Sequence, residues 1–404
     1  LVVNQTGTTV FDVRQYSATV TGTTDIDGTI QISTGTFTAN GDSDIDGTLT
    51  INGSGIYDAK NFDATGATVQ FTGSGGTLKL GGATVSSIGN TFTAGTGTVE
   101  YDYEGNQNVK SRTYYNLEID GTGSKSTQGD ITINNNLTIT AATLDIGTGD
   151  DNLNIGGNFT NTGTFSSSGE VITFDGTSSQ TIPAISDAAA TIYINKSSGT
   201  ATTNGDLILN RLYLQDGTLL VDGETLTMDD NYGLTFNGGT LQITSGLVHI
   251  TSSSSNSLQM NGGTLDIDGG EVRVGDMTDY DSEFNVTSNG GILDVSGGLL
   301  NIASHIDVAD NFTLTISGGA INVGASTTND AGWGNSSVNT VDIDGGTLNF
   351  NGGTFSVLRQ YSSSSRRAID LHSSVTVNTN SACNVIFGRG SSTSEDMYLD
   401  LNGK

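Results

Sequence analysis

The chain has 404 residues, including 57 glycines and a single proline, and a formal net charge of −29. Such an excess of acidic residues excludes nucleic-acid binding as a leading function, because the phosphate backbone requires a basic protein surface. The single cysteine, Cys383, excludes an intramolecular disulfide, and the sequence lacks the run of about 18 apolar residues that a membrane span requires.

The N-terminal region, residues 1–90, contains two similar phrases, TDIDGTIQISTGTFTAN and SDIDGTLTINGSGIYDA. The Asp-Ile-Asp-Gly tetrapeptide of the first begins at Asp25 and that of the second at Asp44. Short strands joined by Gly-containing turns are expected from this pattern. Residues 1–20 alternate only loosely and form either the first coil or a cap.

The central region, residues 91–231, contains a longer repeat. TFTAGTGTVEY, which begins at Thr91, is answered by TFSSSGEVITF at Thr164, and DITINNNLTIT at Asp130 is answered by DLILNRLYLQD at Asp206. Two super-repeats of about 75 residues are therefore predicted, each made of three coils of about 25 residues.

This central region resembles the Thr- and Gly-rich repeats of very large cell-surface proteins of Bacteroidetes-type bacteria, many of them exported by the type IX system and interpreted as adhesins. The phrases that carry the resemblance are TFTAGTGTVEY, NLEID, LTIT, TLDIG, LNIGGNFTNTGTF and VITFDGTSSQTI. The resemblance implies a surface-exposed, repetitive, non-enzymatic stalk or adhesin segment. No sorting domain of that family is recognisable after Asp400, so either the chain is a piece of a larger protein or the resemblance concerns architecture alone.

Residues 232–357 repeat a Gly-Gly phrase in five variants: GGTLQITSGLVHI, GGTLDIDGGEVRV, GGILDVSGGLLNI, GGAINV and GGTLNFNGGTFSV. They begin at Gly238, Gly262, Gly290, Gly318 and Gly345. Apolar and polar residues alternate between the glycines, as in strands with one buried face. A short, fixed period of this kind favours a β-solenoid over a propeller, whose blades are longer. The expected fold is all-β, a single continuous right-handed parallel β-helix of about 16 coils over residues 1–404, its hand taken from the crossover rule.

The C-terminal coils, residues 358–404, are less acidic than the rest of the chain. They contain five basic and four acidic residues, whereas seven acidic residues and one arginine lie between Leu1 and Asp58. An open C-terminal coil that meets the acidic first coil of another copy would form a head-to-tail contact. The arginines expected at this subunit interface are Arg359, Arg366, Arg367 and Arg389.

The tetrapeptide Asp-Ile-Asp-Gly occurs four times and is the candidate metal site, with calcium as the candidate ion. Stacked coils can bring such carboxylates together, and Ca²⁺ binds carboxylate oxygens in flexible geometry. The favoured interpretation is plainer, with Asp in solvent, Ile in the core and Gly in a turn, so that no cofactor is required. The candidate ligands are Asp25, Asp27, Asp44, Asp46, Asp266, Asp268, Asp342 and Asp344.

Aromatic residues in two polar insertions are candidate glycan contacts: Tyr101, Tyr103 and Trp333. Rings on a solenoid flank can stack on sugars, although packing onto a neighbouring coil is the favoured role. No Ser-His-Asp or Cys-His spacing is present, and we expect no catalytic residues and no enzymatic activity.

The sequence thus predicts an extracellular, structural or adhesive cell-surface protein that associates head-to-tail into a filament. Its expected partners are other copies of itself, with glycans or cell surfaces as further candidates. The alternative is a carbohydrate-binding or polysaccharide-cleaving β-helix protein.

Overall fold

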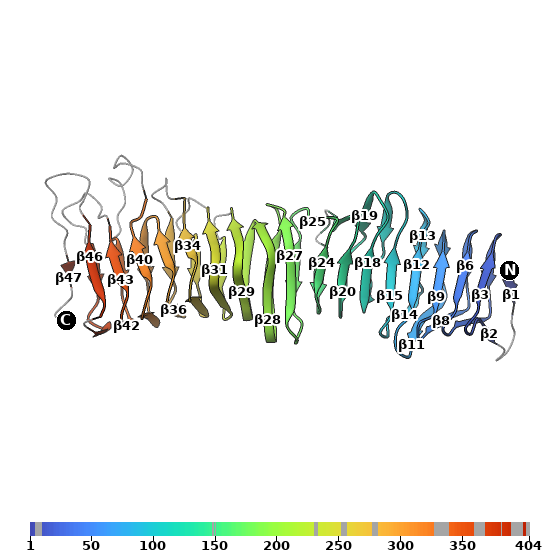
Figure 1. Ribbon diagram of the computed structural model, residues 1–404, viewed down its shortest axis with the longest axis horizontal. Coiled ribbons are helices and arrows are strands. Elements are labelled where there is room, and N and C mark those ends of the chain that lie inside the picture. Colours follow the sequence, from blue (N-terminus) through green and yellow to red (C-terminus); the bar gives the residue numbers. More distant parts are fainter. Residues whose placement is uncertain are drawn as a thin grey trace. The chain divides into compact units, whose positions relative to one another are not determined.

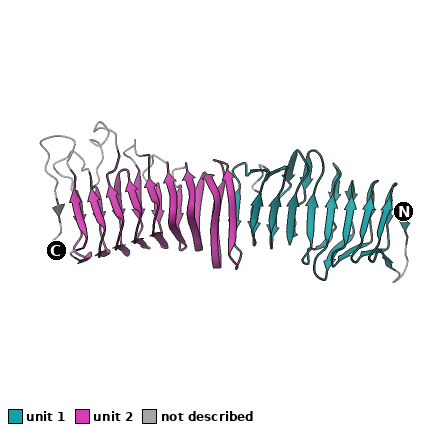
Figure 2. Cartoon of the chain, viewed as in Figure 1, with its two compact units in different colours: residues 1–176 teal, residues 177–404 magenta. Residues whose placement is uncertain are grey.

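The structure, a computed structural model, describes residues 1–4, 10–147, 149, 151–229, 233–251, 257–276, 282–326, 339–358, 368–380 and 382–388, and the backbone of 399–400. The chain divides into two compact units, Leu1–Gly176 and Thr177–Lys404 (Figure 2). Every element among the described residues is a strand (Figure 1), and their stacked parallel coils form a β-solenoid. The prediction of an all-β solenoid is confirmed.

The described residues of unit 1 contain five rows of parallel strands. One sheet contains β1 (Val2–Val3), β4 (Thr24–Ile26), β7 (Ser43–Ile45), β10 (Phe62–Asp63) and β13 (Val85–Ser87). Another contains β2 (Val10–Asp12), β5 (Thr29–Ile32), β8 (Thr48–Asn52), β11 (Thr68–Thr72) and β14 (Thr91–Thr93). The longest contains β3 (Ser17–Val20), β6 (Thr36–Ala39), β9 (Ile56–Ala59), β12 (Thr77–Leu80), β15 (Thr98–Tyr101), β18 (Asn116–Ile119), β21 (Leu137–Ile139) and β24 (Phe159–Asn161).

The remaining strands of unit 1 form two further rows. One contains β16 (Gln107–Val109), β19 (Ser124–Thr127), β22 (Thr143–Asp145) and β25 (Thr164–Ser166). The other contains β17 (Thr113–Tyr114), β20 (Ile131–Ile133), β23 (Leu153–Ile155) and β26 (Val171–Phe174).

Inward side chains of successive coils stack directly on one another in unit 1. Phe37, Tyr57 and Leu78 are in register on β6, β9 and β12, and each is fully buried. The rings of Phe37 and Tyr57 are stacked with centroids 5.2 Å apart. Burial of one side chain per strand and coil is the main stabilising contribution in such a fold, at about 1.5–3 kcal/mol for each large apolar residue.

Unit 2 begins with β27 (Gln180–Ser186), β28 (Thr191–Leu209) and β29 (Arg211–Met228) and continues as three rows of strands. The first row contains β31 (Thr240–Ile250), β33 (Thr264–Ile267), β36 (Gly291–Val295), β39 (Phe312–Ile316), β42 (Gly346–Phe350) and β45 (Thr376–Thr379). The second row contains the end of β31, then β34 (Glu271–Val274), β37 (Leu299–Ile302), β40 (Ala320–Val323), β43 (Thr354–Val357) and β46 (Asn384–Phe387). The third row contains β30 (Leu234–Phe236), β32 (Leu258–Met260), β35 (Glu283–Val286), β38 (His305–Val308), β41 (Val341–Ile343), β44 (Ile369–Leu371) and β47 (Leu399–Asp400).

The length of a coil in unit 2 is set by one connection, between the second and third rows. Where the first row passes to the second, Ile267 and Glu271 are joined by a short turn, and the equivalent connections are equally short. Between the second and third rows, Ile302 is followed almost at once by His305, whereas the whole stretch 324–340 separates Val323 from Val341. Such long coils explain why the chain makes about 14 turns instead of the 16 predicted.

After Gly290, the Gly-Gly phrases do not all begin equivalent strands, contrary to the sequence prediction. Gly291 pairs with Phe312 of β39, whereas β40, which is the AINV of GGAINV, pairs with β37 of the second row. GGAINV therefore corresponds to GGLLNI and not to GGILDV. In the next coil, the first-row strand β39 begins at Phe312, and no Gly-Gly pair precedes it.

The offset between the two super-repeats of the central region is also not a whole number of coils. TFTAGTGTVEY contains β15 and TFSSSGEVITF contains β26, and these two strands lie in different sheets of unit 1. Within one sheet, Val99 pairs with Leu117, Leu117 with Leu137 and Leu137 with Phe159. Successive coils there differ in length, and each is shorter than the length of about 25 residues that three equal coils per super-repeat would require. That prediction was wrong.

The glycine of the Asp-Ile-Asp-Gly phrase lies where adjacent coils come closest. A Cβ atom at Gly47 would overlap the carbonyl oxygen of Gly28 in the preceding coil. Gly319 must be glycine for a further reason, because its backbone φ is positive, at 60°. Glycine is needed at Gly47 for proximity and at Gly319 for backbone conformation as well.

Among the described residues, no helix is long and apolar enough to cross a membrane.

Candidate functional site

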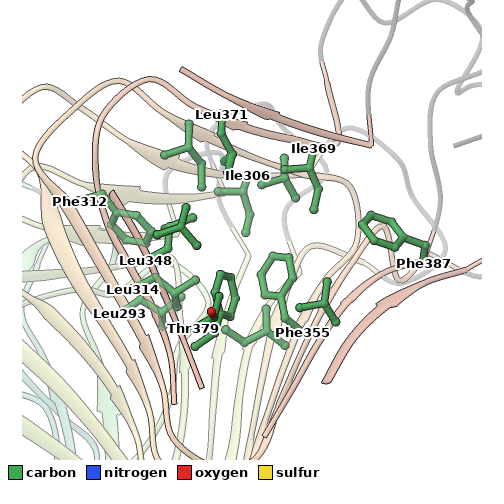
Figure 3. A pocket seen from close by; sticks show the side chains of 16 residues that line it. Leu293, Ile306, Phe312, Leu314, Leu348, Phe355, Ile369, Leu371, Thr379 and Phe387 are labelled. Atoms are coloured by element: carbon green, nitrogen blue, oxygen red, sulfur yellow. The ribbon is translucent and has the colours of Figure 1, made fainter. Parts of the chain in front are cut away.

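An apolar hollow of about 490 Å³ lies inside the last described coils of unit 2. Inward side chains from all three rows point toward it, as Figure 3 shows for Phe312, Leu348, Phe355, Ile369 and Phe387. The described strands β45 and β46 each pair with a strand on one side, β42 and β43 respectively. Their other edges lack a partner among the described residues.

Exposure of inward residues shows that the edge of β46 is uncovered. Val385 pairs with the inward Phe355 of the preceding coil, but it is 48% exposed, compared with 3% for Phe355. Phe387 is 41% exposed. Strands with free backbone groups beside exposed apolar side chains are templates for further strand pairing.

The first coil of unit 1 has the same character. Strands β1, β2 and β3 are each at the end of a sheet. Phe11 points inward, in register with the fully buried Ile30, yet it is 36% exposed. Each unit therefore presents, among its described residues, one apolar edge of parallel strands.

A row of polar side chains follows the outer face of the third row of unit 2. Asn285, Asp307, Asp342 and Asp370 are in register on β35, β38, β41 and β44. The amide nitrogen of Asn339 donates to both Asp342 and Asp370, at 3.0 Å each. Burial, followed by the charges of Glu283 and Asp342, raises the pKa of Asp307 to about 6.

A buried serine, histidine and glutamate lie beside this row. His305 Nε2 is 3.3 Å from Glu283 Oε1, and its Nδ1 is 2.8 Å from Ser304 Oγ. The arrangement has the partners of a hydrolytic triad. However, Ser304 has no exposed surface, so a substrate carbonyl cannot reach its hydroxyl. The contacts hold the imidazole in place between two coils.

The four Asp-Ile-Asp-Gly phrases are not brought together. In unit 1, Asp25, Asp44 and Asp63 are in register on β4, β7 and β10. Asp44 and Asp63 line a hollow of about 360 Å³. Burial, followed by the charge of Asp46, raises the pKa of Asp44. Asp27 and Asp46 lie exposed in the turns after these strands.

In unit 2 the two phrases occupy different rows. Asp266 lies on β33 of the first row, in register with Asp294, whereas Asp342 lies on β41 of the third row. Asp268 accepts hydrogen bonds from Ser296 at 2.6 Å and Gln242 at 2.9 Å, which lower its pKa. Asp344 is exposed after β41.

Within the part of the chain that the structure describes, no group of three or more His, Cys, Asp or Glu residues is placed to hold a metal ion. Calcium binding stays a prediction.

The predicted aromatic contacts have different positions. Tyr101 is fully buried, and its hydroxyl lies 3.1 Å from that of Tyr114. The prediction that Tyr101 contacts a ligand was wrong, because its side chain fills the inward position of β15. Tyr103 is half-buried, and Trp333 lies outside the described residues.

The predicted interface arginines, Arg359, Arg366, Arg367 and Arg389, also lie outside the described residues. Their charge is a fact of the sequence alone.

The sequence analysis missed two lysines that point into the core. Lys125 is fully buried, and its ammonium donates to the carbonyl oxygens of Tyr103, Gly105 and Thr122 at 2.6–2.8 Å. Lys196 is also fully buried and donates to Ser178 O and Gln180 Oε1. The sequence contains a pattern that points to these lysines. The super-repeat aligns Gln107 with Gln180, and each of these glutamines lies next to a buried lysine of the following coil.

The third-row cluster was missed for a different reason. Glu283 lies one coil before His305 and Asp307, and because coil lengths differ in unit 2, no fixed spacing in the sequence predicts that these residues are neighbours.

Comparison with protein-family models, curated proteins and solved structures found no match.

Proposed function

We propose that this protein is a non-enzymatic, extracellular structural element of a cell surface, whose copies associate head-to-tail. In this proposal the β45 and β46 edge of one copy receives the β1, β2 and β3 edge of another. The observation that carries the proposal is the exposure of inward side chains at the edges, 48% for Val385 and 36% for Phe11.

Both the backbone and the side chains of the two edges favour this contact. Parallel strand addition would satisfy unpaired N–H and C=O groups on both edges. The apolar hollow under β45 and β46 would at the same time be closed by a coil with inward apolar side chains. Each 100 Å² of apolar surface removed from water contributes about 2.5 kcal/mol.

Charge favours contact between the two different edges over contact between two N-terminal edges. The region after Leu358 contains five basic and four acidic residues, whereas the stretch from Leu1 to Asp58 contains seven acidic residues and one arginine. Complementary charge guides association and disfavours contacts between two acidic edges. A head-to-tail contact whose rotation does not close into a ring generates a filament.

Sedimentation velocity over a range of protein concentrations tests the proposal. We expect the wild-type protein to form larger species as its concentration rises, and Phe11→Lys or Val385→Lys to remain monomeric. Ile292→Lys is the matched control, because Ile292 is 45% exposed on β36, away from both edges. If the control abolishes association, or if the wild-type protein is monomeric throughout, the proposal is wrong.

A carbohydrate-binding or polysaccharide-cleaving function is the second candidate. The in-register carboxylates of Asp307 and Asp342 on the outer face of the third row support it, because carboxylates accept hydrogen bonds from the hydroxyl groups of sugars. Acid and base roles for two carboxylates require different pKa values, as burial provides for Asp307. Retention of acidic or neutral glycans on an array, lost in Asp342→Ala, would favour this function.

A further inference from the structure

The third row of unit 2 has a seam at which two carboxylates meet on adjacent strands. Asp307 on β38 is in register with Asp342 on β41, and adjacent strands in a sheet lie about 4.8 Å apart. Like charges at directly opposed positions of neighbouring strands are destabilising. The next pair, Asp342 and Asp370, is bridged by the Asn339 amide, which donates to both carboxylates.

The surroundings of Asp307 are strongly acidic. Among the described residues, the titratable groups that face it are Glu283 on β35, His305 on its own strand, and Asp342 and Asp344 on β41. His305 is the single group of the four that can be positive, and its Nε2 is directed at Glu283 at 3.3 Å. The neighbour on the other side, Asn285, is neutral. No described residue places a cation against Asp307.

The inner side of the same strands is weakly supported. Ile306 on β38 and Val341 and Ile343 on β41 line the apolar hollow. Side chains beside a void lose packing contacts on that side. The contact between β38 and β41 therefore depends in part on the outer face, where the carboxylates meet.

We propose that Asp307 and Asp342 form a proton-operated latch, which holds β38 to β41 when the pair carries a proton and weakens this seam when both carboxylates are charged. In the protonated state one carboxyl donates a hydrogen bond to the other carboxylate, as in carboxyl pairs that share a proton. In the charged state the two groups repel each other across adjacent strands. The latch does not depend on association between copies.

The direction of the pH effect follows from linkage. The pKa of Asp307 is about 6 in the folded coil, against 3.8 for a free side chain. A carboxyl whose pKa is raised by folding stabilises the folded form fully below its unfolded pKa, and this contribution is lost as the pH rises through the folded pKa. The seam is therefore strongest in mild acid and weakest at neutral and higher pH.

Hydrogen exchange with mass spectrometry, in the presence of a chelator, measures the seam directly. After correction for intrinsic rates, we expect opening of β38 and β41 to increase by about three- to tenfold from about pH 5 to about pH 7.5. Strands β37 and β40, whose outward Asn301 and Asn322 are neutral and in register, should change less. Equal or greater protection of β38 and β41 at the higher pH would overturn the latch.

Variants separate the latch from general effects of pH. Asp307→Asn should remove most of the pH dependence of β38 and β41 and increase their protection at about pH 7.5. Asp342→Asn removes the other member of the pair and should act in the same direction, so it also serves if Asp307→Asn does not fold. The control Asp222→Asn, at an exposed carboxylate bonded to Thr244 and Ser245, should keep the wild-type dependence. Retention of the wild-type dependence in Asp307→Asn or Asp342→Asn would also overturn the proposal.

Discussion

Lys125 places its ammonium nitrogen 2.7 Å from the carbonyl oxygen of Tyr103, inside unit 1, where the next two coils have the apolar Leu144 and Phe165 in register with it. The same nitrogen donates to Gly105 and Thr122, so all three of its hydrogens have acceptors. Burial lowers the pKa of Lys125. The side chain closes a turn of the preceding coil with hydrogen bonds that an apolar residue cannot make.

We expect Lys125→Met to destabilise unit 1 by about 3 kcal/mol, because three carbonyl oxygens around the buried ammonium lose a charged donor. Urea denaturation followed by circular dichroism measures the change. The matched control is Lys60→Met, at an exposed lysine of the same unit, which should change stability by less than about 0.5 kcal/mol. Equal effects of the two substitutions would contradict a structural role for the Lys125 ammonium.

The hydroxyl of Tyr101 accepts a hydrogen bond from the backbone N–H of Lys110 at 3.1 Å and lies 3.1 Å from the hydroxyl of Tyr114. Tyr101→Phe removes both contacts without leaving a large cavity and should cost about 1–2 kcal/mol in urea denaturation. A ligand-binding role would instead leave stability unchanged, which would contradict the packing described for this side chain.

Gly47 of the second Asp-Ile-Asp-Gly phrase has no room for a Cβ, whereas nothing lies within 4 Å of a Cβ built on Gly22. Gly47→Ala should therefore destabilise unit 1 by about 2 kcal/mol or more, because coils cannot separate without loss of backbone hydrogen bonds. Gly22→Ala should be close to neutral. Comparable melting temperatures for the two variants would show that the coils can adjust at Gly47.

Calcium binding by the Asp-Ile-Asp-Gly carboxylates can be tested by calorimetry with and without a chelator. We expect the melting temperature to be unchanged, because in unit 2 Asp266 and Asp342 lie in different rows and Asp268 is already hydrogen-bonded. A fall of several degrees, restored by calcium, would instead identify the in-register Asp25 and Asp44 of unit 1 as the first carboxylates to substitute.

The fold could be predicted because it depends on local alternation. Leu265, Ile267, Val272 and Val274 are all fully buried, as expected for residues of alternating strands. The coil register was less predictable. It depends on connections such as the one between Val323 and Val341, whose length does not follow a period.

The candidate site was predictable only in part. The open C-terminal coil was inferred from the sequence, whereas residues 1–20 were expected to form either the first coil or a cap; in the structure both Val385 and Phe11 are exposed. In contrast, the acidic seam joins Asp307 to Asp342 across an entire coil, so no sequence motif contains it. Its chemistry arises from burial and stacking, which only the structure defines.

The central claim is that copies meet at the edge strands, and hydrogen exchange in dilute and concentrated protein tests it most directly. At high concentration the amides of β1, β2 and β3 and of β45 and β46 should become protected, while inner strands such as β9 and β33 stay unchanged. Cys383, half-buried next to β46, should also react more slowly with a thiol reagent. Identical exchange of the edge strands at both concentrations would contradict the claim.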